Sequence, residues 1–285
     1  MQLSVIIVNY RVYPYLSDCI ESVKKAIAGI AAEIIVVDNE SDAAAILAIQ
    51  LRFADIQVIA NADNRGYSSA NNQALSISKG NYVLFLNPDT LVPVNAVNQC
   101  IGHMNAHPDA GAIGVKMVNE QGVFLPESKR SFPTPLPAFF KLSGMAALFP
   151  ASGFFNRYAL GNLNADSNHC VDILAGAFFF TRKEIMNRLN GFDERFFMYG
   201  EDIDLSKRIQ NLDFKNYYLG SIELLHYKGA STNKNSSRYH RYFYRSMELF
   251  VEKYYPGNAN FLKRTGLLAG IAMAKKIALL KNGLS

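Results

Sequence analysis

The chain has few cysteines, and they form no pattern. Cys19, Cys100 and Cys170 are odd in number and widely spaced, which argues against a disulfide framework and a cysteine-based zinc site. We expect three core or near-core thiols in a reducing cytoplasm. The N-terminal residues lack a basic region and a small-residue cleavage site, so nothing predicts export. Neither repeats nor a disordered composition are present in 285 residues of 49% hydrophobic content, enough for one large α/β domain with or without an appendage.

A long apolar run is also missing. The best candidate, residues 266–280, is interrupted by Lys275 and Lys276 before the roughly 20 residues that a membrane-spanning helix needs. Residues 238–285 hold nine Lys or Arg against two Glu, and aromatic residues are interleaved with these charges. Such a mixture suits an anionic membrane surface better than a nucleic-acid groove. The alternative is a solvated helical subdomain.

Residues 1–118 alternate apolar strand patterns with helical ones. The strand patterns lie at residues 3–10, 33–38, 56–60 and 81–87, and helical patterns follow the first three. This alternation predicts an α/β fold, with a mostly parallel sheet flanked by helices on both faces. Ligands of such sheets bind outside the carboxyl ends of the strands, where Asp38 and Asp89 are expected.

The pattern changes in the second half. Residues 119–168 lose periodicity and collect prolines among aromatics, which is typical of an acceptor-binding or lid region with weak helical pieces. Residues 171–182 predict a strand with Gly176 in its middle, where a ligand or another backbone approaches closely. A helix at 183–189 and a later strand ending near His226 complete the series.

The segment 196–206, FFMYGEDIDLS, is the most informative one. Glu201, Asp202 and Asp204 follow an aromatic run and a glycine, and apolar residues then recur at helical spacing. The positive end of a helix macrodipole favours an ionised carboxylate, so Asp202 is suited to accept a proton. The alternative is that these acids are ordinary residues of a helix cap.

The residues at strand ends each allow two interpretations. Asp38 either caps the next helix or accepts a hydrogen bond from a nucleobase or ribose. Asp89 follows the stiff Pro88, and Mg²⁺ or Mn²⁺ takes one or two carboxylates plus phosphate oxygens. A diphosphate leaving group needs that neutralisation. His226 is either structural or a second metal ligand. Arg182 either adds charge to the diphosphate or is a simple surface arginine.

Seven motifs, in order, resemble the family 2 glycosyltransferases with the GT-A fold, most of all their rhamnosyltransferase-like branch. They cover about residues 2–233 and read VIIVNY, IIVVDNES, NRGYSSANNQAL, GNYVLFLNPDT, AGAFFFTR, GFDERFFMYGEDIDLSKR and HYKGAST. The resemblance implies inverting transfer of a sugar, rhamnose in that branch, from a dTDP- or UDP-sugar to a saccharide or lipid-linked saccharide during polysaccharide synthesis.

The same resemblance assigns roles to residues. It implies that Asp202 is the catalytic base with Glu201 beside it, that Asp38, Asn64, Gly66 and Asn71 bind the nucleotide, that Asp89 is the acid of the DxD-type motif that binds a divalent cation, and that His226 lies near the metal and diphosphate. One departure is the sequence Asn87-Pro88-Asp89, which leaves a single acid in this motif. We therefore expect a modest affinity for the metal.

These expectations divide the chain into three parts. Residues 1–237 form the GT-A domain, with a nucleotide-binding half at about 1–118 and an acceptor-binding half at about 119–237, and residues 238–285 form a basic aromatic helical tail. The expected location is the cytoplasm, at the inner face of the cell membrane. One rival is a non-catalytic sugar- or lipid-binding protein with the same fold. The other, a sugar nucleotidyltransferase, needs a Gly-rich phosphate loop with Arg and Lys near the N-terminus, which is missing.

Overall fold

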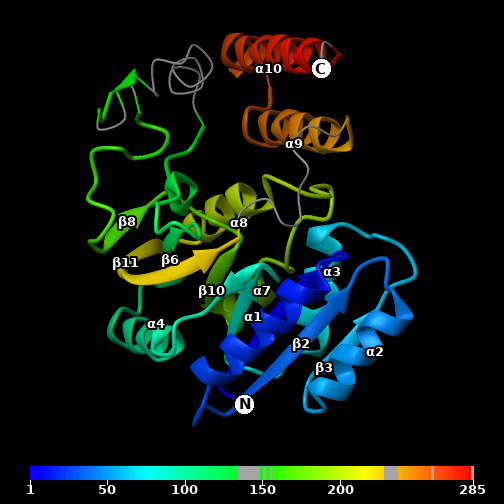
Figure 1. The fold of residues 1–285 in the computed structure, drawn as a ribbon. Helices are drawn as coiled ribbons and strands as arrows, with labels where there is room; N and C mark the ends of the chain where they lie inside the picture. The colour runs from blue at the N-terminus through cyan, green and yellow to red at the C-terminus, as the bar shows by residue number, and fades with distance from the viewer. Residues whose placement is uncertain (134–147, 150–151, 155, 228–236, 258–259, 284–285) are drawn as a thin grey trace.

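The computed structural model describes residues 1–133, 148–149, 152–154, 156–227, 237–257 and 260–283 (Figure 1). The first half contains β1 (Leu3–Asn9), α1 (Tyr13–Ala26), β2 (Ala32–Asp38), α2 (Ala43–Arg52), β3 (Gln57–Ala60), α3 (Tyr67–Ile77), β4 (Tyr82–Leu86), β5 (Thr90–Leu91), α4 (Ala96–Ala106) and β6 (Ala110–Val118). The second half contains a 3-10 turn (Pro126–Ser128), β7 (Lys129–Arg130), β8 (His169–Val171), β9 (Ile173–Leu174), β10 (Phe178–Arg182), α7 (Lys183–Arg188), α8 (Glu201–Gln210), β11 (Lys215–His226), α9 (Ser237–Tyr254) and α10 (Phe261–Gly283).

Most of the strands form one mixed sheet. Within the described residues its order is β3-β2-β1-β4-β10-β6-β11-β5, and β8 also pairs with β11. Strands β1, β2, β3 and β4 run parallel to one another, whereas β10 runs antiparallel to β4 on one side and to β6 on the other. The predicted alternation of strands and helices is confirmed, and so is the mixed, mostly parallel sheet. The carboxyl ends of β1, β2 and β4 meet the start of β10 at one edge.

Strand β1 shows why the first strand is apolar along its whole length. Val5 and Ile7 face a core cluster that includes residues of α1, α2 and α4. Ile6 and Val8 face a second cluster that includes residues of α3, α7 and α8. A parallel strand covered on both faces needs apolar residues at every position. The sheet is thus the middle layer of three, as Figure 1 shows.

The strand predicted at residues 171–182 is broken in the structure. Strand β8 pairs with β11, β9 pairs with β7, and β10 pairs with β4 and β6. The chain changes partners at Asp172 and again over residues 175–177, so Gly176 lies in a gap before β10 and not inside a strand. The prediction of one continuous strand is therefore wrong, because periodicity does not show where a chain changes its partner.

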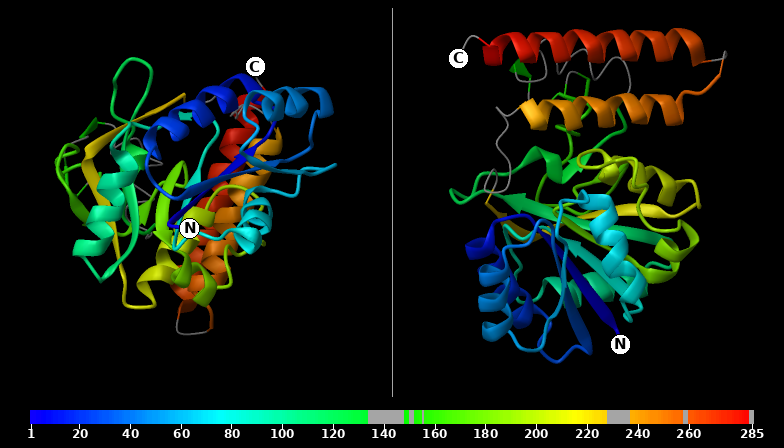
Figure 2. Two further views of the ribbon diagram at one scale, coloured as in Figure 1. Left: turned by 90° about the horizontal axis from the view of Figure 1, so that it is seen from below. Right: turned by 90° about the vertical axis from the view of Figure 1, so that its right-hand side faces the viewer.

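The C-terminal extension is helical, as expected, but it consists of two antiparallel helices (right-hand view of Figure 2). Helices α9 and α10 pack through a small core of their own that includes Tyr244, Val251, Leu267 and Ile271. Helix α9 lies against the start of α8, and α10 lies beyond it, away from the sheet. No helix in the described part of the chain is long and apolar enough to cross a membrane.

The three cysteines differ in their surroundings. All are free thiols; Cys19 and Cys100 are buried, whereas Cys170 is exposed. Burial raises the pKa of the Cys19 thiol to about 12. The prediction of core thiols is correct for these two residues. It is wrong for Cys170, which lies in the short strand β8 opposite Tyr217 of β11.

Candidate active site

Asp202 lies in the first turn of α8, with its carboxylate held from three sides. Its Oδ2 accepts a hydrogen bond from Arg130 Nη2 at 2.5 Å and one from the Gly176 backbone N–H at 3.3 Å. Its Oδ1 accepts a bond from the Ile203 backbone N–H at 2.8 Å. About 15% of the Asp202 side chain is exposed, so the carboxylate is ordered and still open to solvent.

Arg130, which the sequence did not single out, is the ion-pair partner of Asp202. It lies on the short strand β7, inside the segment expected to bind the acceptor, and its side chain is 13% exposed. It also donates to the Leu174 carbonyl at 3.1 Å. Burial lowers the pKa of this guanidinium, but Asp202 and Tyr158 together raise it above its usual range. Arg130 is therefore a permanent cation beside the candidate base.

Glu201 is a second carboxyl group in the same turn, but its environment differs. Its residue is 9% exposed, and its Oε2 is buried with no hydrogen-bond partner among the described residues. Burial, and then repulsion from Asp202, raise the pKa of Glu201 to about 8. Glu201 is thus mostly protonated near neutral pH, and a protonated carboxyl donates a hydrogen bond where Asp202 only accepts one.

Asp204, the third acid of the segment, has a structural role. Its buried carboxylate pairs with Arg208 Nε at 2.8 Å and with Lys253 Nζ at 2.6 Å, and it accepts a bond from Tyr254 Oη at 2.7 Å. None of the three acids is the N-cap residue of α8, which is Gly200 in a left-handed conformation with φ near 80° and no side-chain bond. All three nevertheless lie in the first turn, and Asp202 accepts a bond from the Ile203 N–H there, so the two interpretations of Asp202 both stand.

The backbone around Gly176 connects Asp202 with the end of β4. The Asn87 N–H donates to the Ala177 carbonyl at 3.0 Å, and Tyr67 Oη donates to the Gly176 carbonyl at 3.1 Å. A side chain on Gly176 would point at the two acids, with Asp202 Cβ 3.5 Å from the added carbon. The atoms that face this glycine are side-chain atoms at ordinary contact distance, so the expected approach of a ligand or another backbone stays a prediction.

Tyr67, which donates to this backbone, lies beside the same acids. Burial raises the pKa of its phenol most, and the charges of Glu201, Asp202 and Asp89 raise it further.

Asp89 and His226, predicted as metal ligands, are neighbours. His226 Nε2 lies 3.3 Å from Asp89 Oδ1, and the Tyr227 N–H donates to the Asp89 carbonyl at 2.9 Å. The pairing of β11 with β5 brings His226 opposite Thr90, which fixes this contact. No group of three or more His, Cys, Asp or Glu suited to a metal occurs in the described residues. One carboxylate and one imidazole fit a cation that takes its other ligands from phosphate and water.

Asp38 is fully buried at the end of β2, and its carboxylate has three partners. Asn9 Nδ2 donates at 2.6 Å, Tyr13 Oη at 2.9 Å and Ser41 Oγ at 2.5 Å. Asp38 does not cap α2, because the N-cap is Asp42, which accepts bonds from the first turn. The capping interpretation is thus wrong. A carboxylate has about four lone-pair positions, so one is left for a ligand.

The three remaining nucleotide-site candidates surround the start of α3. Asn64 Oδ1 accepts from the Gly66 N–H at 2.9 Å, and Asn39 Nδ2 donates to the Gly66 carbonyl at 3.2 Å, which joins this turn to the end of β2. Gly66 has φ near 83°, and a side chain there would meet the Phe197 carbonyl at 2.6 Å. Asn71 is buried one turn later, and its Oδ1 has no partner among the described residues.

Arg182 is not part of this site. It ends β10 opposite Tyr82, at the sheet edge far from Asp89. Its guanidinium donates to the carbonyls of Met104 at 2.7 Å and Ala110 at 3.2 Å. The idea that Arg182 adds charge to a diphosphate is therefore wrong, because β10 runs antiparallel to β4 and carries the residue away.

The aromatic residues of α9 pack inward and cover the turn that leads to Glu201. Tyr242 stacks on Phe197 with ring centroids 4.3 Å apart, and Ser246 Oγ donates to the Met198 carbonyl at 3.0 Å. Lys253 bridges Asp193 and Asp204 at 2.7 and 2.6 Å. The tail is thus a packed helical unit, in which Tyr244 and Phe250 are buried and the other aromatic side chains of α9 are partly buried.

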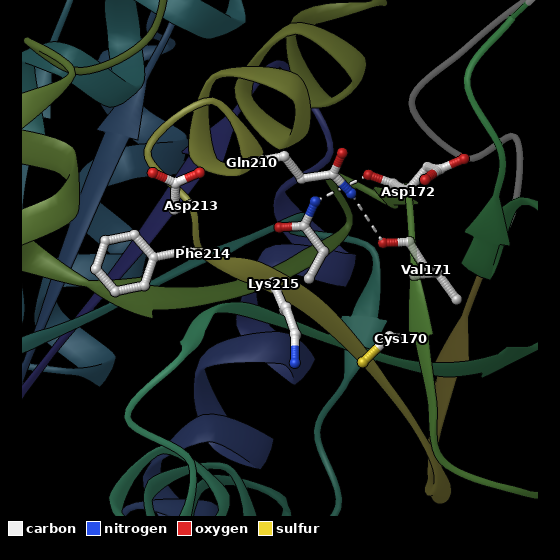
Figure 3. Close-up of a pocket in the computed structure, with 8 residues that line it drawn as sticks. Cys170, Val171, Asp172, Gln210, Asp213, Phe214 and Lys215 are labelled. Carbon is white, nitrogen blue, oxygen red and sulfur yellow. Dashed lines mark hydrogen bonds between the residues drawn. The ribbon is translucent and has the colours of Figure 1, made fainter.

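A shallow pocket lies elsewhere, at the C-terminal end of α8 (Figure 3). Its polar side chains tie elements together: Gln210 Nε2 donates to the Val171 carbonyl at 3.4 Å, and Asn216 Nδ2 donates to the Asp172 carbonyl at 2.8 Å. None of the predicted site residues lines it. We therefore assign the chemistry to the edge with Asp202 and Asp89, which the hydrogen bonds and charges define.

Comparison with known proteins settles the family. The model of "Glycosyl transferase family 2" matches residues 4–185, more than half of the chain. The chain belongs to this family. It is a glycosyltransferase.

Individual relatives agree with this assignment. The chain is 24% identical over 270 residues to the N-acetylglucosaminyl-diphospho-decaprenol L-rhamnosyltransferase of Mycobacterium tuberculosis, covering 90% of this chain and 85% of the relative. It is 26% identical over 204 residues to Rhamnosyltransferase WbbL of Escherichia coli K12, covering 69% of this chain and 74% of the relative.

Solved structures show the same fold. The mannosyltransferase PcManGT of Pyrobaculum calidifontis, in complex with GDP-Man and Mn²⁺, superposes with a TM-score of 0.57 at 16% identity. The match covers 98% of this chain and 75% of that one. The GT-A fold expected from the sequence is therefore confirmed.

Proposed function

We propose that this glycosyltransferase transfers rhamnose, with inversion, from a nucleoside-diphosphate sugar to a lipid-linked saccharide acceptor in the synthesis of a cell-surface polysaccharide. The names of the two rhamnosyltransferase relatives support the sugar, and that of the mycobacterial relative supports the acceptor class. The observation that carries the proposal is the placement of one ionised carboxylate, Asp202, across Gly176 from Asp89 and His226.

Asp202 is the proposed base. In an inverting displacement the acceptor hydroxyl attacks the anomeric carbon from the face opposite the leaving diphosphate, so one base on the acceptor side is sufficient. The Asp202 carboxylate is partly exposed and oriented by Arg130 and two backbone N–H groups. It takes the proton of the acceptor hydroxyl as the new glycosidic bond forms and the bond to the diphosphate breaks.

Arg130 and Glu201 assist on the acceptor side. Arg130 is paired with Asp202 and fixes the rotamer of this carboxylate. Glu201, protonated near neutral pH, is available to donate a hydrogen bond on the acceptor side. Two adjacent acids in one turn thus take different roles, because Asp202 is paired with Arg130 whereas Glu201 is buried.

Asp89 and His226 would hold a divalent cation with the diphosphate of the donor. When bound, Mg²⁺ or Mn²⁺ would neutralise the charge that develops on the leaving diphosphate. The PcManGT complex, which contains Mn²⁺, supports such a requirement. Asp38, Asn64, Gly66 and Asn71 are the proposed contacts of the nucleotide, at the half of the domain formed by about residues 1–118.

The test is the variant Asp202→Asn, assayed with dTDP-, UDP- and GDP-sugars in the presence and absence of Mn²⁺. Loss of a general base should lower kcat by roughly 10² to 10⁴ while nucleotide binding is kept. Asp55→Asn is the matched control, since Asp55 is an exposed acid paired with Lys24 far from the site. A rate above half of the wild-type value in Asp202→Asn would exclude this base.

The rival of a non-catalytic binding protein makes a different prediction. Such a protein would bind a nucleotide sugar but release no nucleoside diphosphate with any donor and acceptor. The ordered Asp202 and the Asp89–His226 pair favour the enzyme, because a partly exposed carboxylate lies near a carboxylate–imidazole pair at the carboxyl ends of the strands.

A further inference from the structure

Large apolar side chains are exposed at one end of the molecule, in two segments that are far apart in the sequence. On α10, Leu262 is 84% exposed and Met273 61%. In the segment 148–154, Leu148 is 75% exposed and Phe154 59%. Figure 1 and the right-hand view of Figure 2 both place this green segment at the level of α10, at the end of the molecule opposite the N-terminus.

The two faces of α10 have different environments. Leu267, Ile271 and Ala274 are buried against α9. Leu262 and Met273 lie on the opposite side of the same helix, since the spacing of eleven residues corresponds to about three turns. An apolar helix face that no described residue covers is a candidate docking surface.

The charge of α10 identifies the partner. The helix has no acidic residue, and its exposed basic residues include Lys263, Arg264 and Lys276. Apolar side chains flanked by Lys and Arg, without acids, match an anionic lipid surface, where the cations meet phosphate and the apolar groups enter the headgroup boundary.

We propose that the outward face of α10 and the described residues 148–149 and 152–154 together form a docking surface for an anionic lipid bilayer. This proposal rests on the proposed function in one respect only: the surface would bring the active site to a lipid-linked acceptor. It differs from the expectation for the tail, because the aromatic side chains of α9 are occupied in packing and α10 takes their place.

The docking surface lies beside the acceptor half of the cleft. The backbone N–H of Ser131 donates to the Tyr158 carbonyl at 2.9 Å, so the segment after 154 is fixed next to Arg130. On the other side, α10 packs on α9, and α9 packs on the start of α8. A bilayer at this surface would therefore face the acceptor side of the site, where Asp202 would take the proton of the acceptor hydroxyl.

The experiment is flotation of the full-length protein with vesicles of phosphatidylcholine alone or with phosphatidylglycerol, at low and high salt. The protein should bind the anionic vesicles at low salt and much less at high salt, with about a fivefold gain in partition for each engaged Lys or Arg. Truncation before α9 is unsuitable, because it would uncover α8 and the residues that hold it.

Point variants test the surface itself. Leu262→Glu combined with Met273→Glu should reduce binding to anionic vesicles at least tenfold, and Phe154→Glu should reduce it as well. Leu51→Glu is the matched control for Phe154→Glu: Leu51 is 77% exposed on α2, at the other end of the molecule, and both changes add one negative charge. This control should bind within twofold of wild type, and all variants should still bind the nucleotide.

Several outcomes would overturn the proposal. One is a wild-type protein that does not bind anionic vesicles at low salt. Another is a Leu51→Glu variant that loses as much vesicle binding as the variants of the proposed surface. A third is a dimer in sedimentation velocity that the α10 double variant dissociates, since a second copy would then cover this face. Transfer to a short, water-soluble acceptor separates the two proposals: activity without vesicle binding refutes the docking surface alone, and vesicle binding without activity refutes the transferase role alone.

Discussion

Replacing Arg130 tests whether the ion pair with Asp202 serves catalysis or only stability. The two side chains are 13% and 15% exposed, and their atoms are 2.5 Å apart. Removing one member of a buried pair costs about 3–5 kcal/mol when the remaining charge is left uncompensated. In Arg130→Met, Asp202 keeps its bonds from Gly176 and Ile203, so we expect a loss near 3 kcal/mol in the free energy of unfolding, measured with urea.

The catalytic effect follows from the loss of orientation. In Arg130→Met, Oδ2 of Asp202 loses its donor at 2.5 Å, and the carboxylate is then held only by the backbone N–H groups of Gly176 and Ile203. We expect kcat to fall roughly tenfold to a hundredfold while the KM of the donor sugar stays within about twofold. Arg130→Lys keeps the charge without the planar fork, and it should restore part of the rate.

Arg182→Met is the control for general damage. Arg182 is also partly buried and bound to backbone carbonyls, but at the opposite edge of the sheet. It should lower stability without lowering kcat. If Arg130→Met keeps more than half of the wild-type kcat, or if Arg182→Met lowers kcat as much as Arg130→Met does, Arg130 does not position the base.

Three further predictions follow from the same contacts. In calorimetry, dTDP or UDP should bind in a metal-dependent way to wild type but not to Asp89→Ala; equal metal dependence would contradict this role. Lys253→Met should cost about 3 kcal/mol of stability, because Asp204 is buried and loses one cation; an unchanged urea midpoint would refute the role of α9 as a support. Gly66→Ala should destabilise by about 1–3 kcal/mol and more than Gly29→Ala, which has a similar positive φ in open space.

The first half of the fold could be predicted because its strands are buried on both faces. Strand β1 has no polar position between Val5 and Val8, and such runs in alternation with helices leave few architectures. The same order placed Asp38 and Asp89 at one edge of the sheet before any contact was known. The start of α8 at Glu201 was also predicted, since Gly200 precedes a run of helical spacing.

The partners of these residues were not predictable in the same way. Arg130 lies in a segment without periodicity, and its neighbour Asp202 is 72 residues away in the chain. Only the pairing of the two-residue strand β7 with β9 brings them together, and so short a strand leaves no pattern in the sequence. The best available signal was a basic pair, Lys129 and Arg130, among prolines and aromatics.

The tail connects these observations. Asp202 is carried by α8, which α9 holds through Ser246 and Lys253, and α10 packs on α9. Its partner Arg130 is carried by β7, next to the residues that follow the segment 148–154. Each half of the proposed docking surface is thus joined to one member of the ion pair at the candidate base. A bilayer that contacts both halves would hold the acceptor side of the cleft at a fixed orientation, because neither half moves without displacing its member of the pair.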